Sequence, residues 1–466
     1  MKKIAILAGG LVGLVAAEAD AHACGACIQP RETPSVVTDH RMIMSISKEQ
    51  STLYDQIRYT GSPSSFGWVL PVVGDIDIGV SSDLVFAALD QRTATQIIAP
   101  PQNCPPIPEA CRQNSRLAGA TALDGGVSAN GSVTVLQRKV VGPYDTAVLK
   151  ATDPTSLFDW ANRNGFVIND DSKPVIDAYQ KENFNFLAVK LVPSAGVQDM
   201  RPIRVTTKGA NVALPLRMVA VGAGATLGIT LWVLSEGRMQ PTNFATFQIV
   251  ADELSWDWAA SKSNFLDVRT AKTAAANGRA WEVESSTSSA SYIYGTPLRQ
   301  ALLYGAYDPA TGAYPTALGD GGYTAPNYEP DGQKTAEQVR DEDLAALFAG
   351  LPSDFRITRL RADLGRAALD QDLTLGASTD QTELPTIRQL TKESNEPQCP
   401  VYSNCQQVST APRSQAAAQT AKNDNPSSND DDGCSAARSR EGTSWAVALF
   451  GFFAFSLSRK LRRRRA

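Results

Sequence analysis

Residues 41–46 read Arg-Met-Ile-Met-Ser-Ile, and residues 52–59 read Thr-Leu-Tyr-Asp-Gln-Ile-Arg-Tyr. Both stretches alternate in the manner of β-strands, and the short polar segment 47–51 between them is typical of a hairpin connection. A third strand is predicted over 65–71, where a proline would end it. Neighbouring strands with no helix between them favour an antiparallel sheet at the start of the chain.

The rest of the body mixes strands with helices. Further strands are predicted over 132–141, 145–150, 185–192, 203–207, 216–221 and 226–235, and helices over 83–98, 155–164, 174–182 and 335–349. The last helix begins at the capping box of Thr335 and Gln338 and ends at Gly350. Because the strands cluster instead of alternating with helices, we expect an α+β fold of mostly antiparallel β-sheets with peripheral helices.

The first 23 residues have the parts of a secretory signal peptide. Lys2 and Lys3 are basic, residues 4–17 are apolar, and Ala21-His22-Ala23 is a small-x-small cleavage site. The apolar stretch is short for a membrane span, so we predict cleavage after Ala23 and export of the chain. A lipoprotein signal would have a large aliphatic residue at the position of Ala21.

The C-terminal end is also organised. We expect a disordered tether over 396–433, which is mostly polar and has too little apolar surface to offset the entropy of ordering it. Residues 434–466 then combine Cys434, an apolar stretch at 445–457 that predicts a short hydrophobic helix, and a basic cluster. The cluster consists of Arg459, Lys460, Arg462, Arg463, Arg464 and Arg465. In an exported chain such a cluster stays in the cytoplasm and stops the helix in the membrane.

Residues 433–466 resemble the MYXO-CTERM sorting signal of exported myxobacterial proteins, which has the same order of cysteine, short apolar helix and arginine cluster. The resemblance implies transient anchoring in the inner membrane and removal of the tail by a sorting protease. It also implies attachment of a lipid at Cys434, so that the mature protein lies at the outer membrane or cell surface or is released to the medium.

Charge restricts the class of partner. The whole chain carries a net charge of −4, but residues 434–466 hold seven net positive charges and residues 1–23 are neutral, which leaves −11 on residues 24–433. So acidic a body argues against a nucleic acid as partner.

Seven cysteines form three local couples and a remainder. The couples are Cys24 with Cys27, Cys104 with Cys111, and Cys399 with Cys405. In an exported chain such couples are typical of disulfides, and we expect local pairing, above all in the two wider couples. The spacing of the first couple also matches redox and zinc half-sites, but it opens the mature chain without a preceding strand, and the other couples lack zinc-ligand spacing.

Several segments of the body resemble the exported bacterial family called domain of unknown function 2330. They are 23–25 with 66–72 (Phe-Gly-Trp-Val-Leu-Pro-Val), 157–166, Tyr179 with 184–191, and 357–361 with Asp372 and Leu373. Ala161 departs from the family, which often has leucine there, and Cys27 is not general in it. The resemblance covers about 23–385 and implies an uncharacterised extracytoplasmic region over 24–395, as one domain or two subdomains. The family has no established activity, so it implies no catalytic residue, metal or cofactor.

The body contains few signs of catalysis. His40 is its single histidine, and no Gly-x-Ser-x-Gly, Walker or zinc-protease motif occurs. The glycines at 222–228 resemble a dinucleotide fingerprint, but the spacing of the last glycine differs and a predicted strand follows. We therefore interpret this segment as a hairpin turn.

Carboxylates and aromatic residues are the remaining candidates. Asp75 with Asp77, Asp170 with Asp171, and Asp252, Glu253 and Asp257 could form a calcium site or a glycosidase pair, although such residues more often cap turns. Trp256 and Trp258 would stack on sugars if exposed, but we expect them in the core. Tyr323 and Tyr328 are weaker candidates for a ligand-facing patch.

These observations favour a non-enzymatic protein displayed at the cell surface, with a structural, adhesive or ligand-binding role and an unknown ligand. The alternative is an extracytoplasmic hydrolase that uses paired carboxylates on a polysaccharide. The two differ in geometry, because a hydrolase should present two carboxylates about 5–10 Å apart in a cleft.

Overall fold

The computed structural model describes residues 31–32, 40–57, 66–108, 138–150, 157, 159–160, 163–164, 173–196, 199–222, 226–289, 298, 302 and 335–424. The expected signal peptide, the sorting segment 434–466 and most of the expected helix 155–164 lie outside these ranges. Among the described residues, no helix is long and apolar enough to span a membrane.

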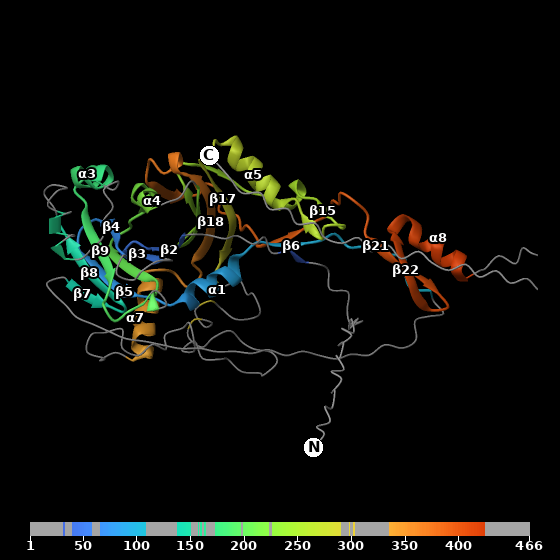
Figure 1. Ribbon diagram of the computed structural model, residues 1–466, viewed down its shortest axis with the longest axis horizontal. Coiled ribbons are helices and arrows are strands. Elements are labelled where there is room, and N and C mark those ends of the chain that lie inside the picture. Colours follow the sequence, from blue (N-terminus) through green and yellow to red (C-terminus); the bar gives the residue numbers. More distant parts are fainter. Residues whose placement is uncertain are drawn as a thin grey trace, which may run out of the picture.

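An eight-stranded sheet forms the centre of the protein (Figure 1). Its strands, in spatial order, are β14 (Ala245–Phe247), β17 (Ala280–Ser288), β18 (Arg356–Gly365), β12 (Thr226–Ser235), β2 (His40–Ile46), β3 (Gln50–Gln56), β10 (Ile203–Lys208) and β5 (Ile76–Val80). All neighbours are antiparallel except the parallel pairs β12–β2 and β14–β17. The predicted hairpin is confirmed as β2–β3, and the predicted α+β class is confirmed as well.

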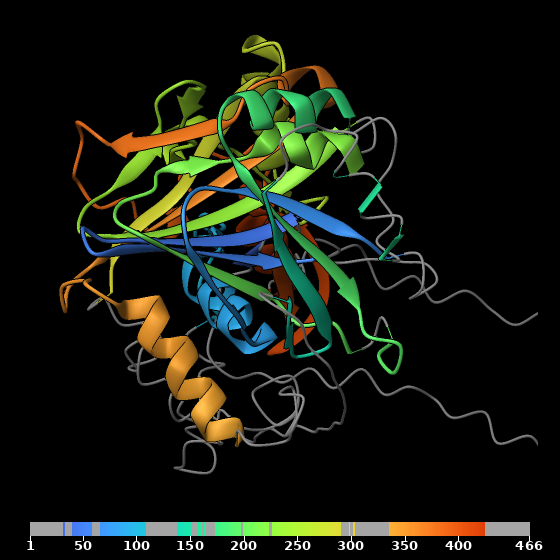
Figure 2. The same cartoon turned by 90° about the vertical axis from the view of Figure 1, so that its left-hand side faces the viewer.

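Both faces of this sheet are covered, because its central strands are apolar on each side. Ile229 and Leu231 of β12 lie in one core, beneath the small sheet of β11 (Ala213–Leu214), β19 (Leu373–Ala377) and β13 (Met239–Pro241). Trp232 and Leu234 point the other way and pack against α1 (Asp83–Thr93) and α7 (Ala336–Phe348). Figure 2 shows these two helices together on one side of the strands.

A second, four-stranded antiparallel sheet packs on the end of the first one. Its order is β4 (Trp68–Val72), β9 (Asn185–Leu191), β8 (Tyr144–Leu149) and β7 (Arg138–Val141). Val72 and Leu187 of this sheet share one core with Ile78 and Val205 of β5 and β10. Helix α3 (Lys173–Lys181) contacts α4 (Leu216–Gly222), and its Tyr179 packs with Phe186 of β9.

Smaller elements extend from the other end. One three-stranded sheet contains β1 (Arg31–Glu32), β6 (Gln96–Ile98) and β20 (Ile387–Gln389). Next to it lie the 3-10 turn η5 (Ala251–Glu253), the strand pair β15 (Trp256–Asp257) and β16 (Lys262–Ser263), and α5 (Phe265–Ala275). A second 3-10 turn, η6 (Arg366–Ala368), follows β18.

The last described segment is folded, although we expected it to be part of a disordered tether. Residues 398–424, which we call the C-terminal module, form the hairpin β21 (Gln398–Ser403) and β22 (Gln406–Pro412) and the helix α8 (Arg413–Asp424). The expectation of disorder over 396–433 is therefore wrong for these residues. Asn404 and Cys405 adopt positive φ values that allow the tight turn, and alanine-rich α8 needs little apolar surface to be helical.

Several predicted elements differ from the structure. The segment 216–221 was expected as a strand and forms α4, so residues 222–228 connect a helix to β12 and are not a hairpin turn. Helix α1 ends at Thr93, and residues 96–98 of the expected helix form β6. Pro71 does not end its strand, because it pairs with Phe186 inside the edge strand β4. The capping box of α7 is confirmed.

Candidate functional site

A groove opens where β4 of the second sheet faces β3 and β10 of the first, with a volume of about 80 Å³. Apolar side chains of both sheets make up most of its walls. The lining residues are Met44, Ser51, Leu53, Leu70, Pro71, Val72, Val73, Phe184, Val205, Thr207, Asn211, Ala213, Pro215 and Asp372. Val73 is 53% exposed at the groove. A space of this size and character accepts a small apolar group, such as an alkyl chain or an aliphatic side chain.

Asp372 is the carboxylate in this groove, and its acceptor positions are occupied. Its Oδ1 accepts hydrogen bonds from Tyr179 Oη at 2.5 Å and from the Arg217 backbone N at 3.1 Å. Its Oδ2 accepts two more from the guanidinium of Arg217, at 3.1 Å from Nε and 2.7 Å from Nη2. A carboxylate has about four lone-pair sites, so these four hydrogen bonds occupy the acceptor sites of Asp372 and hold its side chain in place.

Arg217 is the centre of this network. Its Nη1 and Nη2 donate to Glu182 at 2.7 Å each, and the guanidinium lies 4.2 Å from the ring centre of Tyr179. Hydrogen bonds to Glu182 and Asp372 raise the pKa of Arg217. The hydrogen bond from Arg217 in turn lowers the pKa of Glu182. Burial, together with Asp372, raises the pKa of Tyr179, so its proton stays in place at neutral pH.

Three segments that carry the family resemblance meet at this groove. Residues 70–72 line one wall, Phe184 lies beside them, and Asp372 closes the end, where it binds Tyr179. The site was not predicted from the sequence, because no single segment carries its pattern alone. The signal that could have found it is the presence of Tyr179, Phe184 and Asp372 in the quoted elements.

The acidic candidates from the sequence are dispersed. Asp77 lies 3.5 Å from Arg204, and Asp75 is exposed beside β5. Glu253 pairs with Lys272 at 2.6 Å, and Asp252 is exposed in the same 3-10 turn. None of these four lines the groove.

Asp257 stabilises a turn. It accepts hydrogen bonds from Asn395 Nδ2 at 2.7 Å and from the Ala260 backbone N at 2.9 Å, which lower its pKa. Asp170 and Asp171 lie outside the described residues. Within the described part of the chain, no group of three or more His, Cys, Asp or Glu side chains could hold a metal ion.

The aromatic and histidine candidates have structural positions. Trp256 is fully buried, as expected, and partly buried Trp258 packs against it with ring centres 6.1 Å apart. His40 begins β2, and its Nδ1 lies 3.8 Å from Oδ1 of buried Asp55. Tyr323 and Tyr328 lie outside the described residues.

A buried group of charges on β17 and β18 was not predicted. Arg269 of α5 donates to Glu282 at 2.6 Å and also to Glu284, which accepts a hydrogen bond from Arg359 as well. Burial and the neighbouring Glu284 raise the pKa of Glu282 to about 7. Burial opposes ionisation of Glu284, but Arg359 and Arg269 outweigh it and lower the pKa of Glu284. Asp90 of α1 binds Arg359 at 2.6 Å, so the group ties α5 and α1 to the sheet.

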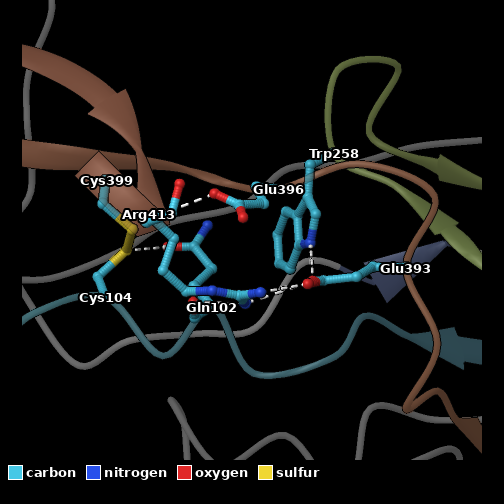
Figure 3. The surroundings of a disulfide bond; sticks show 8 residues. Gln102, Cys104, Trp258, Glu393, Glu396, Cys399 and Arg413 are labelled. Atoms are coloured by element: carbon cyan, nitrogen blue, oxygen red, sulfur yellow. Dashed lines mark hydrogen bonds and ion pairs between the residues drawn. A yellow bond between two sulfur atoms is a disulfide. The ribbon is translucent and has the colours of Figure 1, made fainter. Parts of the chain in front are cut away.

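The cysteines pair differently from the local couples. Cys104 forms a disulfide with Cys399, 295 residues away (Figure 3). Cys405 is also disulfide-bonded, so it does not pair with Cys399. Local pairing in the two wider couples is therefore wrong, whereas the disulfide assignment of Cys104, Cys399 and Cys405 is confirmed. Cys24, Cys27, Cys111 and Cys434 lie outside the described residues.

Comparison with known proteins identifies one family. A family model described as "Uncharacterized protein conserved in bacteria (DUF2330)" matches residues 18–292. No curated protein and no solved structure matches the chain. The match ends before β18, so it does not include the resemblance at 357–361 and 372–373, although β18 lies between β12 and β17 in the central sheet. With more than half of its residues matched, the chain belongs to the DUF2330 family of uncharacterised bacterial proteins.

Proposed function

We propose that this chain is an exported surface protein whose groove between the two sheets binds an apolar ligand group without catalysing a reaction. The observation that carries this proposal is the state of Asp372. The carboxylate of the groove accepts four hydrogen bonds from Tyr179 and Arg217, and the other walls are mostly apolar. A general acid or base needs a free position for the proton it transfers, and Asp372 has none.

The disulfides support the exported location. Cytosolic proteins keep cysteines reduced, whereas Cys104, Cys399 and Cys405 are all disulfide-bonded here. An N-terminal signal and a C-terminal sorting signal would place the body outside the inner membrane, held through the hydrophobic helix and then through a lipid on Cys434. The partners in this proposal are the membrane, the sorting protease and an unidentified ligand.

The polysaccharide hydrolase is the weaker alternative. Asp257, Glu253 and the other described acidic candidates cap turns, form ion pairs or lie exposed away from the groove. No observation on these residues favours hydrolysis.

Two valines of nearly equal exposure test the groove. Val73 is 53% exposed and lines it, whereas Val408 is 55% exposed and lies in the C-terminal module. The probe is 1-anilinonaphthalene-8-sulfonate, whose fluorescence increases in apolar surroundings. Val73→Ser removes methyl groups that the bound dye would contact. Each buried CH₂ contributes about 0.8 kcal/mol, so the variant should bind the dye about 3- to 10-fold more weakly than the wild type does. Val408→Ser should bind as the wild type does. Equal affinities in all three proteins, or no binding, would overturn the groove assignment.

Mass spectrometry of the protein from membrane and medium fractions tests the location separately. We expect a mature N-terminus after Ala23, loss of the arginine tail and a lipid on Cys434. An unmodified Cys434 with the tail attached would refute sorting, and it would leave the groove assignment unaffected.

A further inference from the structure

The C-terminal module has too small a core to hold itself in place. Its buried apolar residues are Cys399, Val401, Ala411 and Ala416, with Cys104 of the body packed against them. Units below about 40 residues need a disulfide, a metal or a partner to remain folded. Figure 1 shows the module at one end of the protein, away from the eight-stranded sheet. Its position therefore depends on its attachment to the segments next to β6 and β20.

The noncovalent attachment is weak. Arg413 of α8 binds Glu393 and donates from Nη1 to the Gln102 carbonyl at 3.2 Å (Figure 3). Trp258 Nε1 orients Glu393 by donating to its Oε2 at 2.9 Å. The side chains of Arg413 and Glu393 are 27% and 22% exposed, and pairs this close to water contribute about 1 kcal/mol or less. These contacts set the orientation of the module without being able to hold it alone.

The Cys104–Cys399 disulfide adds a constraint directly beside these contacts, and Cys405 forms a second disulfide from the same module. The parallel pair β6–β20 brings residues 98 and 390 together, where the Leu390 N donates to the Ile98 carbonyl at 2.9 Å. From this point one strand of chain runs to Cys104 and the other to Cys399, so the disulfide closes a ring of about 15 residues. Closing such a ring changes the equilibrium between docked and detached module on the order of 100-fold.

We propose that the Cys104–Cys399 disulfide is a redox-dependent clasp that keeps the C-terminal module folded and docked, and that its reduction releases the module while the body stays folded. The proposal goes beyond the binding groove, and only its physiological setting rests on the proposed export. In an oxidising compartment the clasp fixes the position of the module, including α8. In a reducing one the module, residues 398–424, becomes a loose extension of the body.

The chemistry requires a dithiol reductant. Cys399 is fully buried and Cys104 is half-buried, so the reductant thiolate attacks the Cys104 sulfur and Cys399 leaves as a thiolate. The second thiolate of the reductant then attacks the mixed disulfide and releases Cys104. Two electrons pass to the protein, both cysteine thiolates take protons from water, and the reductant becomes a disulfide.

Hydrogen–deuterium exchange of the purified full chain tests the clasp independently of its location in the cell. The double variant Cys104→Ser/Cys399→Ser should lose protection of the amides of 398–424 about 100-fold, while those of β12 and β18 keep theirs. Cys405→Ser is the matched control, because it breaks the other disulfide that joins the module to the rest of the chain, and it should retain most of the protection. The Cys405→Ser variant treated with dithiothreitol should lose the same protection as the double variant, and reoxidation should restore it.

Three outcomes would overturn the proposal. The first is unchanged protection of 398–424 in the double variant. The second is an equal loss over β12 and β18, which would make the disulfide a support of the whole fold. The third is loss in Cys405→Ser but not in the double variant, which would assign the clasp to the other disulfide.

Discussion

Replacing Asp343 with alanine tests how α7 is held on the eight-stranded sheet. The side chain of Asp343 is completely buried, and its Oδ2 accepts a hydrogen bond from Ser81 Oγ at 2.6 Å. Its Oδ1 lies 3.5 Å from Nη1 of Arg204, whose side chain is 8% exposed. Tyr54 adds a hydrogen bond to the Asp343 carbonyl at 3.2 Å, so one turn of α7 contacts β3, β10 and the end of β5.

The expected loss follows from the charge that remains. Asp343→Ala removes the buried carboxylate partner of Arg204 and leaves the buried guanidinium with the exposed carboxylate of Asp77, 3.5 Å away. Breaking one side of a buried ion pair costs about 3–5 kcal/mol. With a urea m-value of about 3 kcal/mol/M, the midpoint of unfolding should fall by about 1–1.7 M. Urea unfolding followed by tryptophan fluorescence measures this shift, because Trp232 lies in the core beneath α7.

Two variants decide whether the reasoning is correct. Asp341→Ala is the control on the same helix, since its side chain is 61% exposed and pairs with the adjacent Arg340, and it should cost less than about 0.5 kcal/mol. Adding Arg204→Met to Asp343→Ala should restore part of the stability by removing the uncompensated charge. A loss below about 1 kcal/mol in Asp343→Ala, or an equal loss in Asp341→Ala, would refute the argument.

Three further predictions concern stability, each measured by urea unfolding. Thr335→Ala removes the acceptor for the Gln338 N at the start of α7 and should cost about 0.5–2 kcal/mol; an unchanged midpoint would contradict the capping role. Gly79→Ala places a Cβ against the guanidinium of Arg204 and should cost about 1–3 kcal/mol, unless Arg204 is shortened to methionine as well. Burial, then Glu284, raises the pKa of Glu282 from 4.5 to about 7, so the native state binds its proton more tightly than the unfolded chain. The free energy of unfolding should therefore fall by on the order of 1–3 kcal/mol as pH rises from about 4.5 to 7. Glu282→Gln should make this pH dependence weaker. The same pH dependence in the wild type and in Glu282→Gln would argue against the buried acid.

Local patterns in the sequence predicted the elements that local physics determines. The alternation at 41–46 and 52–59 predicted the β2–β3 hairpin, and the strand 226–235 has the bounds expected for β12. The capping box at Thr335 marked the start of α7. In each case the side-chain period or the cap is a property of a few neighbouring residues.

Features that depend on distant residues were missed. The segment Leu-Arg-Met-Val-Ala-Val-Gly at 216–222 has a strand-like composition, but Arg217 is fixed by Asp372 and Glu182, and the segment forms a helix. β17 was overlooked because Glu282 and Glu284 interrupt its apolar pattern, and their arginine partners come from α5 and β18.

The cysteine pairing could not be read from local spacing. Cys104 and Cys399 meet because β6 and β20 pair in parallel, and no local spacing indicates that contact. The groove was missed for the same reason, since its walls come from segments more than 300 residues apart, such as those of Met44 and Asp372.

The position of β2 in the central sheet also determines when the protein can fold. β2 pairs in parallel with β12, about 190 residues later, and β12 in turn needs β18, which ends at Gly365. At about 5–20 residues per second, synthesis from β2 to the end of β18 takes roughly 15–65 s, during which the sheet cannot close. Chains of such high contact order also fold slowly once complete. Under the export proposed above, this delay would keep the polypeptide unfolded and able to thread through an export channel, while its β-rich segments stay exposed to aggregation in the meantime.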